Sequence, residues 1–417
     1  MSRRCPARAD DFSQAMSLPL SIHWDFYDQV AGLDAPYGPR EMSALCRAAK
    51  AAGARSLNFR AEGAGMAWVP SSDRPLFARY EPGLALPWCA QGRMPRDKEV
   101  QEARQRVAEL FRRTYELCPD PLEAAANAAR EAGIQLNVYV CPYDQYWPGV
   151  PETLVEAYPE RCIASRDGRM RLPVPSLAYE ETRRWLLKYY DAVLAHDVAD
   201  VIVYPGSHGW YQYPVDVPDD WFGFEEPAVE EYRARTGIDV RSGDFDIDDY
   251  YRHYGTYWTR LLRELSERQK RRGRRVIVGM DLGEWQVYLP WNAPRLMTTW
   301  RHGNDWREWT SWSNVDLCVG QQTNIWEYDR WPANQLPYMP GSPGRPPYLW
   351  ARDLFGARGR RAFELHAFLS LHADRADVEL PLAARGTREG GFDGLMVREA
   401  ADFEFKLGWG RLADLRP

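Results

Sequence analysis

Acidic side chains of this chain recur near the ends of short apolar runs that have the length of β-strands. Cleavage of a glycosidic bond commonly needs two carboxyl groups, one to protonate the leaving oxygen and one to attack the sugar or to activate water. Carboxylates placed at strand ends therefore predict hydrolysis of a glycosidic bond. The candidate catalytic residues are Glu284, Glu364, Asp281, Glu399 and Glu226.

Glu284 and Glu364 form the preferred catalytic pair, and Asp281 supports them. Asp281 and Glu284 follow the apolar run 276–280, and Glu364 lies two residues before His366, on the same side of a strand. Which residue is the acid stays open, because the environment sets a pKa. The structural alternatives are a helix start at Glu226, a turn cap by Asp281, a barrel hydrogen bond between Glu364 and His366, and an ion pair of Glu399 with Arg398 or Arg60.

Polar and aromatic side chains near the other strand ends are expected to bind the substrate. Any single one of them can instead be a satisfied polar group of the interior, so the prediction depends on the set. The predicted substrate-binding residues are His23, Asp25, Asn58, Arg60, Glu62, Tyr143, Asp144, Trp147, Tyr204, His208, Trp210, Trp285, Trp291, Gln321 and His366.

Eight of the 18 tryptophans lie between Trp285 and Trp331. Their spacing follows neither the helical period of about 3.6 residues nor the strand period of about 2. This predicts an irregular, Trp-rich loop at about 284–312. Two interpretations remain open: the rings stack on sugar faces, or the segment is a lid that packs on itself.

Other chemistries have weaker support in the sequence. The seven histidines contain no His-x-His or His-x-x-x-His pair, and the segment Gly206-Ser207-His208-Gly209 is not the Gly-x-Ser-x-Gly elbow of a serine hydrolase. No Gly-rich phosphate loop follows a strand. We therefore predict neither a metal nor a cofactor.

The elements that must position these side chains alternate between strand and helix. The eight strand candidates are 20–26, 56–62, 134–140, 201–204, 276–280, 315–319, 363–368 and 394–397, and helical patterns separate most of them. This order, with long loops after the strands, predicts an α/β fold: a (β/α)8 TIM barrel over residues 1–417, with an insertion at about 64–119. A doubly wound open sheet is the alternative.

Composition limits the partners of the protein. The chain has 417 residues, of which 45% are hydrophobic, and a net charge of −6. A carbohydrate partner fits this balance, whereas a nucleic acid or an anionic membrane surface is not indicated. The seven cysteines are scattered, no run reaches membrane-spanning length, and no signal-like stretch is found. These features predict a cytoplasmic protein, and they leave its oligomeric state open.

Several short motifs lie between residues 120 and 240. They are Asp120-Pro121-Leu122-Glu123, Ala129-Arg130-Glu131-Ala132-Gly133-Ile134, Asn137-Val138-Tyr139-Val140, Ala157-Tyr158-Pro159-Glu160, Asp167-Gly168, Glu181-Thr182-Arg183-Arg184-Trp185, Phe222-Gly223-Phe224-Glu225-Glu226-Pro227, Glu231-Tyr232-Arg233 and Thr236-Gly237-Ile238-Asp239. Together they resemble the family 10-like bacterial glycosyl hydrolases, which implies a TIM barrel and a glycosidase-like activity. Relatives of that group carry an acid at the end of the fourth strand, which is missing from Ala199-Asp200-Val201-Ile202-Val203-Tyr204-Pro205.

Three functional hypotheses follow. The first is a glycoside hydrolase that acts on an oligosaccharide, a polysaccharide or a glycoside through two carboxylates and without a cofactor. The second is a non-catalytic carbohydrate-binding barrel, which the missing acid of the fourth strand motivates. The third is a sugar lyase or isomerase that uses the same rim, with Tyr204 or His208 as the base.

Overall fold

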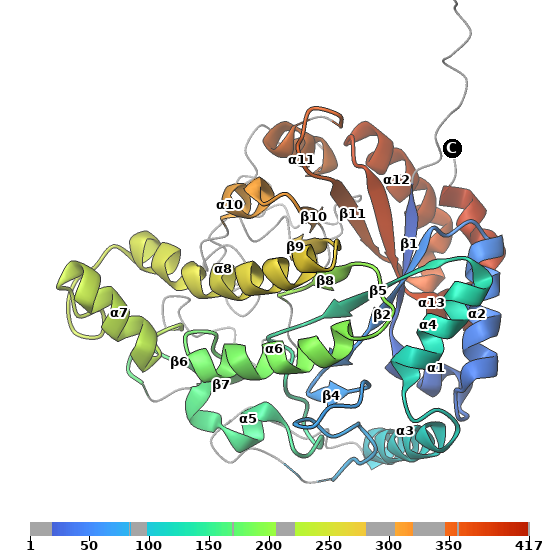
Figure 1. Ribbon diagram of the computed structural model, residues 1–417, viewed down its shortest axis with the longest axis horizontal. Helices are drawn as coiled ribbons and strands as arrows, with labels where there is room; N and C mark the ends of the chain where they lie inside the picture. The colour runs from blue at the N-terminus through green and yellow to red at the C-terminus, as the bar shows by residue number, and fades with distance from the viewer. Residues whose placement is uncertain are drawn as a thin grey trace, which may run out of the picture.

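The computed structural model describes residues 19–82, 84, 98–168, 171–205, 222–280, 305–319, 347–356 and 358–415. Eight parallel strands form a closed barrel in the order β1-β12-β11-β10-β9-β8-β5-β2, which β1 and β2 close (Figure 1). This confirms the predicted TIM barrel. The barrel strands are β1 (Leu20–Trp24), β2 (Ser56–Arg60), β5 (Gln135–Val140), β8 (Val201–Val203), β9 (Val276–Met280), β10 (Val315–Val319), β11 (Leu365–Ser370) and β12 (Gly394–Arg398).

Helices surround the barrel, and α6 and α8 cross its front in Figure 1. The helices are α1 (Phe26–Leu33), α2 (Pro39–Ala51), α3 (Lys98–Leu117), α4 (Pro121–Ala132), α5 (Leu154–Ala157), α6 (Glu180–Leu194), α7 (Glu226–Thr236), α8 (Ile247–Arg271), α10 (Trp306–Ser311), α11 (Pro347–Phe355), α12 (Ala376–Glu389) and α13 (Ala400–Asp402). Two short hairpins, β3 (Glu62–Gly63) with β4 (Met66–Ala67) and β6 (Cys162–Ala164) with β7 (Arg171–Pro175), lie outside it. The predicted insertion at 64–119 contains β4 and α3.

Helix α4 shows how the local sequence sets the boundaries of an element. The Asp120 carboxylate accepts a hydrogen bond from the Glu123 amide at 3.1 Å, and Pro121 occupies the first helical position, where no backbone donor is needed. Gly133 ends the helix in the left-handed region, at φ 65°. The predicted start and stop signals are confirmed.

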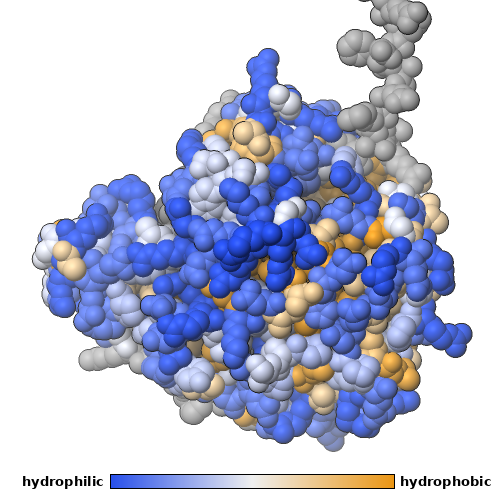
Figure 2. All heavy atoms as spheres, viewed as in Figure 1, coloured by the Kyte–Doolittle hydropathy of each residue, from blue (hydrophilic) through white to orange (hydrophobic). Residues whose placement is uncertain are grey.

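The helices around the barrel have a polar side toward solvent and an apolar side toward the strands. In Figure 2 the face over α6 and α8 is mostly hydrophilic, with apolar side chains in scattered places. The opposite side of α8 is buried through Tyr254, Trp258, Leu261, Leu262 and Leu265, as its helical spacing predicts. No helix among the described residues is both long and apolar enough to cross a membrane.

Three levels of side chains fill the inside of the barrel. At the amino-terminal end lie charged groups, among them Arg275, Asp316 and Glu364. Above them the Asn137 amide donates to Asn58 Oδ1 at 2.9 Å. The third level holds the rings of His23, Tyr139, Tyr204 and Phe368, which lie 4.7–5.9 Å apart where they touch. The carboxyl ends of the strands lie beyond this ring layer.

The start of β11 differs from the predicted strand 363–368. The strand extends from Leu365 to Ser370. The Glu364 amide donates to the Asp316 side chain, at 2.7 Å, and not to the backbone of a neighbouring strand. Glu364 therefore precedes its strand and lies at the amino-terminal end of the barrel. The expectation that it stands at a carboxyl-terminal strand end is wrong.

Candidate active site

A cavity of about 220 Å³ opens at the carboxyl-terminal end of the barrel. The segments that follow β1, β2, β5 and β12 build most of it, and α3 adds one side chain. Its lining residues are Asp25, Tyr27, Asp28, Arg60, Ala64, Met66, Phe77, Tyr80, Arg104, Trp147, Val150 and Arg398. Barrel enzymes carry their catalytic groups at this end, so the cavity is the candidate active site.

Three carboxyl groups meet at this site. Asp25 follows β1 and caps α1, where its side chain accepts from the Tyr27 amide at 3.1 Å. Asp28 lies one helical turn further along, and Glu399 directly follows β12. The ligand oxygens of Asp25, Asp28 and Glu399 all lie within 4.8 Å of one another.

Burial and mutual repulsion keep a proton in this cluster. Burial raises the pKa of Glu399 to about 9, the charges of Asp28 and Asp25 add to this, and Arg398 opposes it. The pKa of Asp28 is also raised, mainly by burial and then by Asp25. Asp28 and Glu399 share a side-chain hydrogen bond. At neutral pH, Glu399 is therefore the protonated member of the pair and Asp28 the acceptor.

Arg60, the last residue of β2, fixes the second side of the cluster. Its guanidinium contacts the Asp25 carboxylate at 2.5 Å and the Asp144 carboxylate at 2.7 Å, and its Nε donates to the Glu62 carbonyl at 2.9 Å. All three nitrogens of this side chain are thus engaged. Asp144 also accepts from the Ala64 amide at 2.7 Å, which ties the loop after β5 to the hairpin β3–β4.

This donor set suits proton transfer better than a metal ion. Asp25 is already paired with Arg60, so the protein itself supplies a positive charge to this acidic cluster. Arg398 lies 3.4 Å from Glu399 and adds a second positive charge beside the cluster. The arrangement can donate a proton from Glu399 and present a fixed carboxylate in Asp25.

Of the ten predicted binding residues that the structure describes, four lie at this site and six lie outside the cavity. Asp25, Arg60 and Trp147 line the cavity, and Asp144 holds Arg60 in place. His23, Asn58 and Tyr204 belong to the barrel interior beneath it, since each is at most 1% exposed. Tyr143 is buried in a stack with Trp258, with ring centroids 5.4 Å apart.

The interior position of His23 has an electrostatic consequence. Burial, and after it the charges of Arg398 and Arg60, lower the pKa of His23 well below its usual range. A neutral imidazole beneath two arginines cannot serve as a cationic ligand for the substrate.

The neighbouring ring of Tyr204 needs a glycine opposite it, because a Cβ at Gly279 would lie 2.0 Å from the tyrosine ring.

Glu62 is a structural residue of the cavity wall. Its side chain is fully buried and pairs with Arg74, and it accepts from Gln145 at 3.0 Å and from Tyr190 at 2.8 Å. Every contact of this carboxylate is internal, and it does not line the cavity. The prediction that it binds substrate is not supported by this placement.

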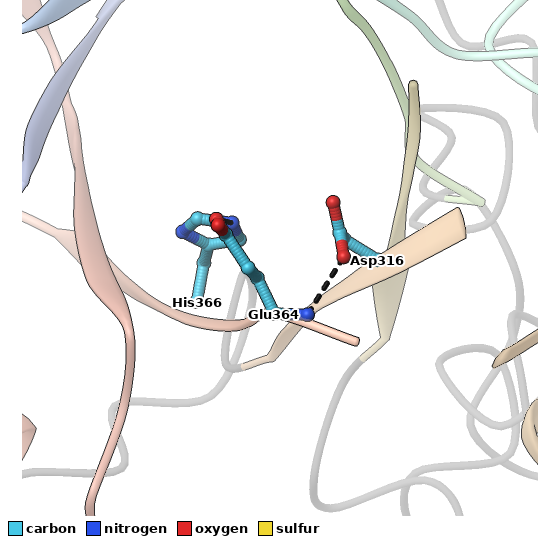
Figure 3. A group of neighbouring side chains, drawn as sticks. All are labelled: Asp316, Glu364 and His366. Atoms are coloured by element: carbon cyan, nitrogen blue, oxygen red, sulfur yellow. Dashed lines mark hydrogen bonds and ion pairs between the residues drawn. The ribbon is translucent and has the colours of Figure 1, made fainter. Parts of the chain in front are cut away.

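Glu364 and His366 belong to a cluster at the opposite end of the barrel, which Figure 3 shows with Asp316. The Nε2 of His366 lies 3.3 Å from Glu364, and this hydrogen bond lowers the pKa of Glu364. Both oxygens of Asp316 are engaged by Arg275. Three ligand-type residues gather here, of which Asp316 is paired with Arg275 and Glu364 lies beside His366 with its side chain 57% exposed.

The two glutamates at the start of α7 have different environments. Glu226 is exposed and pairs with Arg241 at 2.6 Å, as expected of an acid at a helix start. Glu225 is buried, accepts from the Ala164 amide at 2.7 Å, and has a pKa raised to about 7, chiefly by burial. Glu225 joins α7 to the hairpin β6–β7, and neither glutamate lines the cavity.

Part of the predicted site lies outside the described residues. These positions are Asp281, Glu284, Trp285, Trp291, His208, Trp210 and Gln321. The Trp-rich segment is described only from residue 305 onward, where Trp309 is buried and donates to Thr259 at 2.9 Å. That portion packs against α8 as helix α10.

Five polar or charged residues of the cavity lining were not predicted from the sequence. For Asp28 a signal exists, because it follows the capping residue Asp25 by three positions and so faces the same way. Arg398 ends a predicted strand and was weighed only as a partner of Glu399. Tyr27, Tyr80 and Arg104 carry no signal, since the last two reach the cavity from the insertion.

Comparisons with known proteins agree with the barrel. The catalytic domain of a beta-amylase from Paenibacillus polymyxa aligns with a TM-score of 0.52 and 11% identity, over 94% of each chain. The glycoside hydrolase domain of PgaB (BpsB) from Bordetella bronchiseptica aligns with a TM-score of 0.52 and 12% identity, over 95% of this chain and 98% of that one. No protein-family model and no curated protein matches the sequence. At such identities the likeness shows a shared TIM-barrel fold.

Proposed function

We propose that the protein is a glycoside hydrolase in which Glu399 is the general acid and Asp25 the second carboxylate. The observation that carries the proposal is the protonated carboxyl group of Glu399, which lies within 4.8 Å of Asp25 and Asp28, two carboxyl groups that line a cavity at the carboxyl end of the barrel. A glycosidic oxygen needs such a proton donor at neutral pH. This choice replaces the pair Glu284 and Glu364, because Glu364 lies at the other end of the barrel.

Asp25 is the better second carboxylate because Asp28 is too close to the acid. A hydrogen-bonded pair such as Glu399 and Asp28 leaves no room for a sugar carbon and its leaving oxygen. Asp25 and Glu399 have oxygens within 4.8 Å of each other, which is nearer the spacing of about 5–5.5 Å in retaining enzymes than the spacing of about 6.5–9.5 Å in inverting ones. We therefore propose retention, with Asp25 as the nucleophile and Asp28 as the group that raises the pKa of the acid.

In this mechanism each charged neighbour has one task. Glu399 gives its proton to the leaving oxygen, and Arg398 then stabilises the carboxylate that remains. Arg60 holds the Asp25 carboxylate in position for attack on the sugar carbon. In the second step a water molecule attacks the sugar carbon while the Glu399 carboxylate takes a proton from that water. The bond between the sugar and Asp25 breaks, and Glu399 is again the acid.

Leaving-group dependence tests the role of Glu399. With Glu399→Gln, we expect the rate on glycosides with a poor leaving group to fall by roughly 10²–10⁴-fold, and to fall much less for dinitrophenyl glycosides, which need no protonation. Asp25→Asn should abolish turnover of both. Glu404→Gln is the matched control, because burial also raises the pKa of Glu404, to about 7, but Glu404 is not a member of the carboxyl cluster of Asp25, Asp28 and Glu399.

Other outcomes would contradict the assignment. An equal loss on both substrate types in Glu399→Gln removes its role as the acid. An inverted product, seen by proton NMR of the anomeric centre, removes Asp25 as nucleophile. Saccharide binding with no product would favour a non-catalytic barrel, and an unsaturated or isomerised product would favour a lyase or an isomerase.

A further inference from the structure

The candidate active site holds two arginines that form no ion pair with an ionised carboxylate among the residues described. Arg104 projects from α3, and none of its nitrogens lies within ion-pair distance of a carboxylate in the described part of the chain. Within the described part of the chain, Glu399 is the one carboxyl group at ion-pair distance from Arg398, at 3.4 Å. Glu399 is the protonated member of its pair with Asp28, so at pH 7 the group that Arg398 contacts is a neutral carboxylic acid.

Arg60 provides the contrast within the same cavity. Its three nitrogens are engaged by Asp25, Asp144 and the Glu62 carbonyl. It is a positioning residue whose charge is matched by two carboxylates, those of Asp25 and Asp144. The unmatched positive charge of the cavity therefore comes from Arg104 and Arg398.

Aromatic rings hold the guanidinium of Arg104 at the cavity wall. Its central carbon lies 4.6 Å from the Trp147 ring centroid and 5.8 Å from that of Tyr80. Such contacts use the flat face of a guanidinium and leave the N–H groups at its edge. One of these N–H groups reaches the Tyr80 hydroxyl at 3.5 Å, a long contact that does not neutralise the charge.

Two arginines with unmatched charge in a small cavity are suited to an anionic ligand. A planar guanidinium binds a carboxylate or a sulfate through two parallel hydrogen bonds, which a neutral hydroxyl cannot reproduce. Neutral sugars are bound by stacking and hydroxyl hydrogen bonds and need no unmatched cation.

We propose that this cavity binds a sugar residue with an anionic group, a uronic acid carboxylate or a sulfate ester, through Arg104 and Arg398. This inference rests on the proposed function for the identity of the site. It specifies in addition that the substrate carries a negative charge. A binding experiment tests this statement, so the test does not require turnover.

The experiment titrates the Glu399→Gln protein with paired oligosaccharides by calorimetry. The pairs are uronic acid oligomers, such as oligogalacturonides and oligoglucuronides, each with its neutral counterpart, and a sulfated counterpart forms a third arm. This substitution replaces one neutral group by another, so the charge of the cavity is kept. We expect the anionic member of a pair to bind at least 10-fold more tightly and to weaken as salt rises.

Substitution of the two arginines locates the interaction. Added to Glu399→Gln, Arg104→Gln and Arg398→Gln should each raise the Kd of the anionic ligand by roughly 10–100-fold and leave the Kd of the neutral ligand nearly unchanged. Arg106→Gln is the control on the same helix, because Arg106 pairs with Asp34 at 3.2 Å and does not line the cavity. Arg104→Lys keeps the charge and should lose only part of the affinity.

The outcomes separate this inference from the proposed function. Equal or tighter binding of the neutral member overturns the inference, as does an equal loss for both members in the arginine variants. Hydrolysis of a neutral glycoside by the wild type, with no binding of any anionic saccharide, overturns the inference and leaves the proposed function intact. Binding of an anionic saccharide that depends on Arg104 and Arg398, without hydrolysis of any glycoside, supports the inference and overturns the proposed function. Tighter binding in the uronic acid arm or in the sulfate arm identifies which anionic group is recognised.

Discussion

The environment of Glu399 makes one side chain the centre of the proposed chemistry. Its carboxyl group loses hydration on burial and stands beside two further carboxyl groups, while a single arginine at 3.4 Å opposes the repulsion. The result is a pKa raised to about 9. A carboxyl group in water would already be ionised at pH 7 and could not act as an acid.

The pH dependence of activity and of stability should both report this group. We expect kcat/KM to fall as the pH rises through about 9, since the acid must keep its proton, and Glu399→Gln should remove that alkaline limb. The folded protein binds this proton up to about pH 9, whereas the ordinary pKa of such a group is 4.5. Between these values the folded state holds more protons, so the stability of the wild type should decline with rising pH relative to Glu399→Gln. Rate profiles and urea unfolding at several pH values measure both effects, and parallel stability curves would contradict the assignment.

Substitution of Glu364 tests whether a carboxylate at the amino-terminal end of the barrel takes part in the reaction. Its carboxylate is 57% exposed at the amino-terminal end of the barrel. We expect Glu364→Gln to leave kcat/KM within about 2-fold of the wild type and to change stability by at most ~1 kcal/mol, since exposed ion pairs contribute little. A loss of activity by more than about 100-fold would restore Glu364 to the reacting pair.

The segments between strand and helix show what the sequence could and could not predict. Strand and helix patterns located all eight barrel strands, and the runs 276–280 and 315–319 coincide with β9 and β10. The predicted strand 363–368 is shifted by two residues from β11. Glu364 stands second in the predicted strand and directly before the observed one, so either boundary puts it at the amino-terminal end.

Side chains from the insertion could not be placed at the site from sequence. Arg104 reaches the cavity because α3 packs beside α1, and Tyr80 because its ring lies against Gly149 in the loop after β5; periodicity encodes neither long-range contact. Asp25 and Arg60 were predicted because each closes a strand. Residues attached to barrel strands are therefore predictable, and those brought in by loops are not.

The hairpin β3–β4 forms one wall of the cavity and should depend on the buried pair of Glu62 and Arg74. Their side chains are 0% and 4% exposed. Glu62→Ala leaves an unpaired buried arginine, so we expect a loss of about 3–5 kcal/mol in unfolding free energy. Arg74→Met should have an effect of similar size, and the double variant should be less destabilised than the sum of the two. Chemical denaturation measures all three variants, and strictly additive losses would show that the pair is not coupled.

The barrel as a whole separates a stabilising end from a reactive end. At the amino-terminal end Asp316 is paired with Arg275, and at the carboxyl-terminal end Asp25, Asp28 and Glu399 repel one another. Charges that are matched stabilise a fold, whereas unmatched charges that serve a reaction reduce its stability. The two ends should therefore respond in opposite ways to removal of a carboxylate.

Asp28→Asn and Asp316→Asn test this separation as a matched pair. Asp28→Asn removes a carboxyl group whose pKa is raised by burial and by Asp25, so we expect unfolding free energy to rise by roughly 0.5–2 kcal/mol while kcat/KM falls. Asp316→Asn leaves Arg275 without its carboxylate, and because Arg275 is 38% exposed we expect a loss of about 1–3 kcal/mol with kcat/KM nearly unchanged. Urea unfolding at pH 7, with rates measured on the same preparations, gives both quantities. If both variants are destabilised and inactive, the two ends are energetically coupled, and the carboxyl-terminal cluster is then part of the structural core of the barrel.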